Sequence, residues 1–221
     1  MLVGLLPMKG NSERVPGKNL RPIAGKPLFA WVTEAMLAAT GVDRVVVDTD
    51  SDEIEERVNQ SFGREVEVVR RPQHLIGDLV PMHDIVANLC ATLDGDDFLQ
   101  THSTNPLLTS ETIEEATAAY YSRSEGYDSL MGVTARHTRF YWEDGRPVNH
   151  DPAVLLRTQD LPPLLEENSN VYIAPRTVIE ATGRRVGSSP VLFPIDAAEA
   201  LDIDEELDFA MAAFLLEARR G

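Results

Sequence analysis

Two carboxylates that can share a metal ion stand near the end of the sequence. Asp202 and Asp204 are two residues apart in the segment LDID. In an extended segment alternate side chains project from one face, so both carboxylates can reach the same ion. Hard oxygen ligands completed by water and substrate phosphates suit Mg²⁺. The alternative is that Asp204 caps the following helix, whose first turn is acidic, and Asp204 can serve both purposes.

A group of cations stands near the start of the sequence. Within residues 1–26 a single acidic residue, Glu13, accompanies Lys9, Arg14, Lys18, Arg21 and Lys26, whereas the whole chain has a formal net charge of −16. The glycines and the proline of the same segment permit sharp backbone turns. The sequence therefore predicts a loop that holds a small polyanion such as a phosphate chain. Charge alone leaves a solvated basic loop equally open.

The glycine pattern of this loop excludes two common phosphate-binding motifs. Six residues separate Gly10 from Gly17, and Asn19 follows Lys18 where a Walker A loop requires Ser or Thr. The dinucleotide pattern GxGxxG is also absent from the segment. The loop therefore belongs to another class of phosphate site.

Composition limits the function classes. The chain has 221 residues, which suits one domain, and we expect residues 1–221 to form it. The acidic balance argues against general affinity for nucleic acid, and the sequence contains no apolar run long enough for a membrane span or a signal peptide. The lone Cys90 permits no internal disulfide and suits a reducing compartment, so a cytoplasmic location is expected.

Alternating apolar runs and helical periods must position these groups. The runs are residues 2–8, 45–47, 66–69, 98–101, 129–133, 171–174 and 191–195. This alternation predicts an α/β fold: a single Rossmann-like domain with a mostly parallel sheet flanked by helices. The loop after the first run is about twenty residues long, against the two to six usual for a strand-to-helix connection, and lies where open α/β sheets bind ligands.

Helical periods predict the elements between the runs. Helices are expected after Pro27, around Ile54 and Val58, along residues 85–93 and 113–120, and after Asp204. The last helix is expected to present one apolar face, formed by Leu207, Ala210, Met211, Phe214, Leu215 and Ala218. Residues 137–163 break the alternation with turn residues and prolines, which predicts a hairpin-like excursion from the domain.

The segment LPMKGNSERVPGKNLRPIAGKPL resembles the head of the acylneuraminate cytidylyltransferase (CMP-sialic acid synthetase) family, whose pattern is PARGGSKGIPGKN followed by LxGKPL. Lys9 replaces an arginine of that pattern, Glu13 a lysine and Arg14 a glycine. Further segments resemble the family in the same order: DRVVVDTDSDEI, RRPQHLIGD, FLQTHSTNPLLTSETI, YDSLMGVT, NSNVYIA and LDIDEELDFAMA. The resemblance implies a nucleotidyltransferase fold along nearly the whole chain.

The resemblance also implies a set of site residues. Nucleotide-binding positions are Pro7, Met8, Lys9, Gly10, Ser12, Arg14, Lys18, Asn19 and Arg71, with Lys9, Arg14 and Lys18 as the catalytic cations. Positions at the sugar acid are His102, Arg157, Asn170 and Tyr172, and the family's metal pair falls on Asp202 and Asp204. Structural alternatives stay open for several of them, since a lone histidine is more often structural and an RRP segment is often a simple turn.

Two further aspartates follow a buried strand in the segment VVVDTD. We expect Asp50 to cap the next helix, although Ser51 can do the same, and the role of Asp48 is left open.

The resemblance implies a magnesium-dependent transfer of CMP from CTP to a nonulosonic, sialic-acid-like sugar acid, with a homodimer formed through residues 137–163. The alternatives are a catalytically weakened nucleotide-sugar binding protein and a cytidylyltransferase for another 2-keto-3-deoxy sugar acid. A metal-dependent glycosyltransferase ranks last, because its DxD motif normally follows an internal strand and the basic loop would be unexplained.

Overall fold

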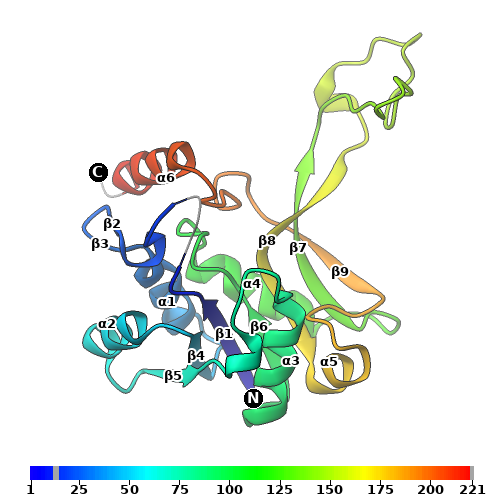
Figure 1. The fold of residues 1–221 in the computed structure, drawn as a ribbon. Coiled ribbons are helices and arrows are strands. Elements are labelled where there is room, and N and C mark those ends of the chain that lie inside the picture. The colour runs from blue at the N-terminus through cyan, green and yellow to red at the C-terminus, as the bar shows by residue number, and fades with distance from the viewer. Residues whose placement is uncertain (12–14, 220–221) are drawn as a thin grey trace.

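The computed structural model describes residues 1–11 and 15–219. At its centre lies a seven-stranded sheet with the strand order β5-β4-β1-β6-β8-β7-β9 (Figure 1). The strands are β1 (Leu2–Met8), β4 (Arg44–Thr49), β5 (Val66–Arg70), β6 (Asp97–Gln100), β7 (Ser129–Arg136), β8 (Leu164–Pro175) and β9 (Pro190–Pro194). Among the described strands of this sheet, β8 alone runs against its neighbours, β6 and β7. The predicted mostly parallel sheet is confirmed.

Helices cover both faces of the sheet, because side chains of a strand alternate between the two faces. Leu2, Leu6 and Met8 of β1 pack with α1, α2 and α4, whereas Val3 and Leu5 pack with α3 and α5. The helices are α1 (Leu28–Ala38), α2 (Asp52–Phe62), α3 (Met82–Thr92), α4 (Ser110–Tyr121), α5 (Arg176–Thr182) and α6 (Glu206–Ala218). The short α5 had no predicted counterpart. Within the described chain, no helix is long and apolar enough to cross a membrane.

Helix α6 packs on a different face from the one predicted. Phe209, Ala212 and Leu216 are buried, whereas Leu207 and Phe214 of the expected face are 68% and 70% exposed. Apolar residues occur around much of this helix, so periodicity does not select a face. Tertiary packing makes the selection instead.

The buried face of α6 belongs to a third apolar cluster that joins distant parts of the chain. Phe209 and Ile203 pack there with Ile23, Leu28 and Leu107. Ile23 lies in a small hairpin of β2 (Pro22–Ile23) and β3 (Lys26–Pro27), which belongs to the long loop after β1. The cluster therefore holds the segment before α6 against the basic loop.

Residues 137–163 form the expected excursion. Strands β7 and β8 continue beyond the other strands as an antiparallel ribbon, with Arg136 opposite Leu164 at its end. Figure 1 shows the intervening segment projecting away from the sheet and its helices. It contains an isolated bridge between Tyr141 and Pro147 and the 3-10 turn η3 (Thr158–Asp160).

Candidate active site

The order of the strands creates a ligand-binding position at the ends of β1 and β6. The chain passes from β1 to β4 and β5 on one side and then returns to β6 on the other side of β1. In open α/β sheets, ligands bind beyond the carboxyl ends of the strands at such a reversal. Lys9 directly follows β1, and His102 lies two residues beyond β6. The fold therefore places both residues at this position.

A cleft of about 270 Å³ opens there and collects most of the predicted site. Its lining includes Pro7, Met8, Lys9, Lys18, Asn19, Arg71, His102, Asp202 and Asp204. Lys9 and Lys18 from the start of the sequence and the two aspartates from its end thus face the same space. Arg21 and Lys26 do not line it and pair with Glu206 and Glu34. Ser12 and Arg14 lie outside the described residues.

Lys18 connects the basic loop to the acidic segment. Its ammonium group donates a hydrogen bond of 2.7 Å to the carbonyl oxygen of Ile203, between the two aspartates. Gly17 precedes the short turn η1 (Lys18–Leu20) with φ of +62°, a left-handed conformation that favours glycine. This turn leads directly into Lys18, whose side chain lines the cleft.

Asn19 ties the same loop to the ends of both strands. Its Nδ2 donates to the carbonyl oxygen of Lys9 at 3.1 Å, and its Oδ1 accepts a bond of 2.7 Å from the Ser103 hydroxyl. The side chain is 8% exposed, so these bonds are largely shielded from water. Asn19 therefore shapes the wall of the cleft.

Lys9 and Gly10 are both engaged with carboxylates. The Lys9 ammonium pairs with Asp78 at 2.7 Å, and both side chains are about half exposed. The Gly10 N–H donates to Asp50 at 2.7 Å, and a Cβ at Gly10 would lie 2.8 Å from Ser51. Gly10 is not among the residues that line the cleft.

Asp50 does not cap α2 as expected, because the Ser51 hydroxyl does so by accepting from the Ile54 N–H.

Arg71 and Asp48 form a buried ion pair at the base of the cleft. The guanidinium contacts Asp48 at 2.6 Å and also donates to the Met8 carbonyl at 3.2 Å. Burial raises the pKa of Asp48 even though Arg71 opposes the shift. The pair accounts for the unassigned Asp48: it orients Arg71, which in turn holds the end of β1.

The acidic segment has features expected of a metal site. Asp202 Oδ1 is buried and has no hydrogen-bond partner among the described residues, and burial raises the pKa of this carboxyl. Asp204 does not cap α6, because Glu205 does so in a capping box with Asp208. These observations fit Asp202 and Asp204 as ligands of a divalent ion.

The donor set also fits magnesium. Over residues 1–11 and 15–219, no cluster of three or more His, Cys, Asp and Glu side chains could hold a metal. Mg²⁺ needs few protein ligands, since it keeps several waters and shares phosphate oxygens with its substrate. Two carboxylates in a cleft that also holds Lys9 and Lys18 therefore suit this ion better than a transition metal that prefers a complete set of protein ligands.

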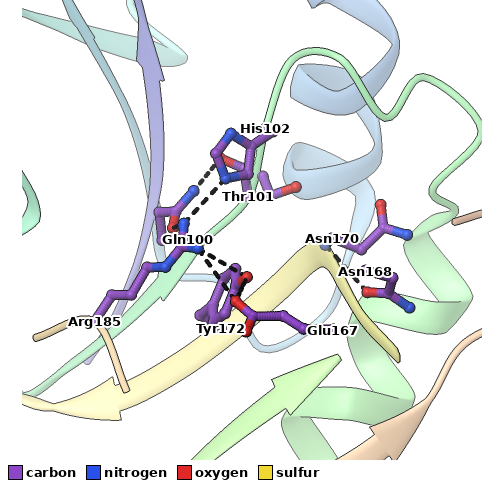
Figure 2. A network of polar contacts seen from close by, with 8 residues as sticks. All are labelled: Gln100, Thr101, His102, Glu167, Asn168, Asn170, Tyr172 and Arg185. Atoms are coloured by element: carbon purple, nitrogen blue, oxygen red, sulfur yellow. Dashed lines mark hydrogen bonds and ion pairs between the residues drawn. The ribbon is translucent and has the colours of Figure 1, made fainter. Parts of the chain in front are cut away.

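A polar network beside the cleft centres on Arg185, which contacts the cleft-lining His102 (Figure 2). One guanidinium nitrogen lies 2.9 Å from Gln100 Oε1 and 3.1 Å from His102 Nε2, and the other donates to the Tyr172 hydroxyl at 2.8 Å. Burial, Arg185 and Lys18 lower the pKa of His102 to about 3. Sequence reasoning missed Arg185, because it lies in the segment GRRVGSSP, which has neither a helical nor a strand period.

Three residues predicted at the sugar acid do not line the cleft. Tyr172 is 1% exposed, and its hydroxyl accepts a hydrogen bond from Arg185. Burial raises the pKa of Tyr172 to about 12. Asn170 is fully buried and donates to the Glu199 carbonyl at 3.0 Å. Arg157 lies on the exposed excursion and pairs with Asp160 at 2.7 Å. Of the four predicted positions, only His102 reaches the cleft in the described chain.

Comparisons with known proteins show which proteins the chain is similar to. A family model described as Cytidylyltransferase matches residues 3–219. The chain is 28% identical to N-acylneuraminate cytidylyltransferase A of Danio rerio, covering 94% of this chain but 49% of that protein. It is 26% identical to CMP-N,N'-diacetyllegionaminic acid synthase of Legionella pneumophila, covering 98% and 96% of the two chains.

A solved structure shows the same fold. CMP:2-keto-3-deoxy-manno-octonic acid synthetase complexed with CTP superposes with a TM-score of 0.74 over 99% of both chains, at 17% identity. The chain spans about half the length of the first curated relatives that it matches.

Proposed function

Because the chain belongs to the cytidylyltransferase family, we propose that it transfers CMP from CTP to the anomeric hydroxyl of a sugar acid. In this reaction the hydroxyl oxygen attacks the α-phosphorus, the bond to the β-phosphate breaks, and pyrophosphate and a proton leave. The observation that carries the proposal is the bond from Lys18 to the Ile203 carbonyl, which joins the cationic loop to the carboxylate pair at one cleft.

The chain's cations hold the triphosphate in this proposal. Lys18 lies beside the acidic segment, and Lys9 exchanges its exposed partner Asp78 for phosphate oxygens. Arg14 is proposed to join them on the strength of the family resemblance alone. Such transfers depend mainly on positioning the reacting groups and neutralising phosphate charge, so no protein base is assigned.

Asp202 and Asp204 are the proposed ligands of Mg²⁺, on the ground that Asp202 has a buried oxygen without a partner. When bound, the ion supplies positive charge at the phosphate oxygens and lowers the pKa of a coordinated hydroxyl. Lys18 is then the neighbouring fixed charge, and its bond to Ile203 keeps the ligand segment in place.

The proposed acceptor is a nonulosonic acid. Two relatives are named for N-acylneuraminate and N,N'-diacetyllegionaminic acid, both of this class, and the second matches over nearly its whole length. His102 lines the cleft and contacts Arg185, and the part of the cleft beside His102 is the proposed position of the acid. We also propose that the enzyme acts as a homodimer through residues 137–163.

A pyrophosphate-release assay tests the reaction. We expect release with CTP, and not with UTP or ATP, in the presence of at least one of a panel of nonulosonic acids. Asp204→Asn should lower turnover about 100-fold or more with an unchanged fold. Asp94→Asn is the matched control, since Asp94 is exposed at the opposite end of β6.

Near-normal turnover of the Asp204→Asn variant would contradict the metal assignment. Binding of CTP without pyrophosphate release, for every acid tested, would indicate the alternative of a nucleotide-sugar binding protein.

A further inference from the structure

We propose that Arg185 is a positioning residue that fixes His102 as a neutral hydrogen-bond donor to the carboxylate of the sugar acid. This inference rests on the proposed function and adds the atom that recognises the acceptor. It begins from the 3.1 Å contact between the Arg185 guanidinium and His102 Nε2.

The contact determines where the imidazole carries its proton. An arginine side chain donates hydrogen bonds and accepts none, so Nε2 of His102 must offer its lone pair. The single proton of the neutral ring is then on Nδ1. An imidazolium would place an N–H against the guanidinium, and the charged groups nearest the ring, Arg185 and Lys18, both disfavour that form.

Arg185 is itself held rigidly enough to impose this state. Its guanidinium lies 3.7 Å from the centroid of the Tyr172 ring and donates to the Tyr172 hydroxyl and to Gln100. Glu167 lies 3.4 Å from the guanidinium and also accepts from the Tyr172 hydroxyl. Only 14% of the Arg185 side chain is exposed. A planar guanidinium held by several contacts is pre-organised for hydrogen bonding, and the ammonium group of a lysine cannot reproduce its geometry.

The donor that results is presented to the cleft. His102 lines the cleft, and Figure 2 shows its second ring nitrogen directed away from Arg185. Within the described part of the chain, the hydrogen bond of the ring is made by Nε2, so Nδ1 is the nitrogen that can donate to a ligand. An N–H beside the cations Arg185 and Lys18 suits an anionic acceptor atom. The carboxylate of a sugar acid has this chemistry.

The tautomer of His102 can be measured by NMR, independently of any activity assay. Long-range ¹H–¹⁵N spectra of the ¹⁵N-histidine-labelled protein should show His102 neutral and protonated at Nδ1 between pH 5 and 8. In Arg185→Met the two tautomers should mix. In Arg184→Met, which removes the exposed neighbouring arginine, the spectrum of His102 should match the wild type.

Steady-state kinetics test the effect on recognition. Loss of a hydrogen bond to a charged group should raise KM for the acid about 10-fold or more in Arg185→Met. KM for CTP and kcat should stay within about twofold, again as in Arg184→Met. With the methyl ester of the acid, the wild type and Arg185→Met should have similar KM values, because the carboxylate is already neutralised.

Either of two results would overturn the proposal: a wild-type His102 that is cationic or protonated at Nε2, or an unchanged KM for the acid in Arg185→Met. Should Arg185→Met fail to fold, His102→Asn and His102→Leu decide the matter. Asn keeps a donor near the position of Nδ1 and should retain most of the acid affinity, whereas Leu should lose it. If the wild type releases no pyrophosphate with any acid, the proposed function fails, and the spectra still report on the tautomer.

Discussion

At the scale of single residues, the proton balance of His102 links the cleft to the stability of the fold. The ring is partly buried and lies near Lys18 and Arg185, and burial and these two charges lower its pKa from the usual 6.5 to about 3. In the unfolded chain these neighbours are gone and the ring binds a proton below about pH 6.5. The unfolded state therefore holds one more proton than the folded state between these two pH values.

This imbalance gives a signed prediction for stability against pH. Because the unfolded state binds more protons, the His102 contribution to the free energy of unfolding rises with pH from about 3 to 6.5 and is lost as pH falls through that window. Its slope is at most about 1.4 kcal/mol per pH unit. His102→Gln should flatten the measured slope by up to this amount in urea unfolding experiments from pH 4 to 7.

The matched control for this measurement is His74→Gln, which changes an exposed histidine. That variant should keep the wild-type slope. Equal slopes in the wild type and His102→Gln would show that the ring titrates normally in the folded protein.

At the scale of elements, α6 organises a site to which it contributes no lining residue of its own. Its buried face joins Ile203 to the loop after β1, and Ile203 separates the two proposed metal ligands. Phe209 occupies the interface and is 9% exposed, with the Arg21 guanidinium 4.1 Å from its ring centroid. The position of the carboxylate pair thus depends on the docking of this helix.

Phe209→Ala should therefore weaken both stability and nucleotide binding. Removal of a buried aromatic ring costs about 3 kcal/mol or more of unfolding free energy. With the acidic segment less firmly held, CTP affinity in the presence of Mg²⁺ should fall about 10-fold, as measured by calorimetry. Phe214→Ala, on the exposed side of the same helix, should change stability by no more than about 0.5 kcal/mol and leave CTP affinity unchanged. Similar effects of the two variants would contradict the docking role.

The same elements explain what the sequence can predict. Each apolar run overlaps a strand of the sheet, and the buried parallel strands β1, β4 and β6 are locally apolar as such strands usually are. The family motifs predict that Lys18 and Asp202 share one site, and both line the same cleft. The buried face of α6, the short α5 and the place of Arg185 depend on tertiary contacts that leave no local period. Tyr172 is a further example, because its motif predicts a strand position but does not predict whether the ring lines the cleft.

At the scale of the whole molecule, charge and apolar surface are unevenly distributed. The chain has a formal net charge of −16, yet Lys9 and Lys18 lie in the cleft. Two lysines at a confined cleft that also holds carboxylates suit a small polyanion bound with a metal ion rather than a nucleic-acid polymer. Exposed apolar side chains gather elsewhere, on the excursion and on the outer face of α6.

The excursion is the proposed surface for a second copy of the chain. Trp142 and Leu155 are 59% and 89% exposed there, on a segment that Figure 1 shows extending away from the rest of the molecule. Exposed apolar side chains are typical of interaction sites where they form a patch, which is the arrangement proposed for this segment. Sedimentation velocity should give twice the chain mass of 24.4 kDa for the wild type and a single chain mass for Leu155→Glu.

Phe214→Glu distinguishes the two apolar surfaces, because it places the same charge on the exposed face of α6. This variant should remain dimeric if the excursion forms the interface. Dissociation of the dimer by Phe214→Glu but not by Leu155→Glu would show that the interface lies on α6. A wild-type protein that sediments with the mass of one chain would contradict the proposed dimer. Since Asp202 and Asp204 lie in the cleft rather than on the excursion, Leu155→Glu should also retain CTP binding, which separates loss of assembly from loss of the site.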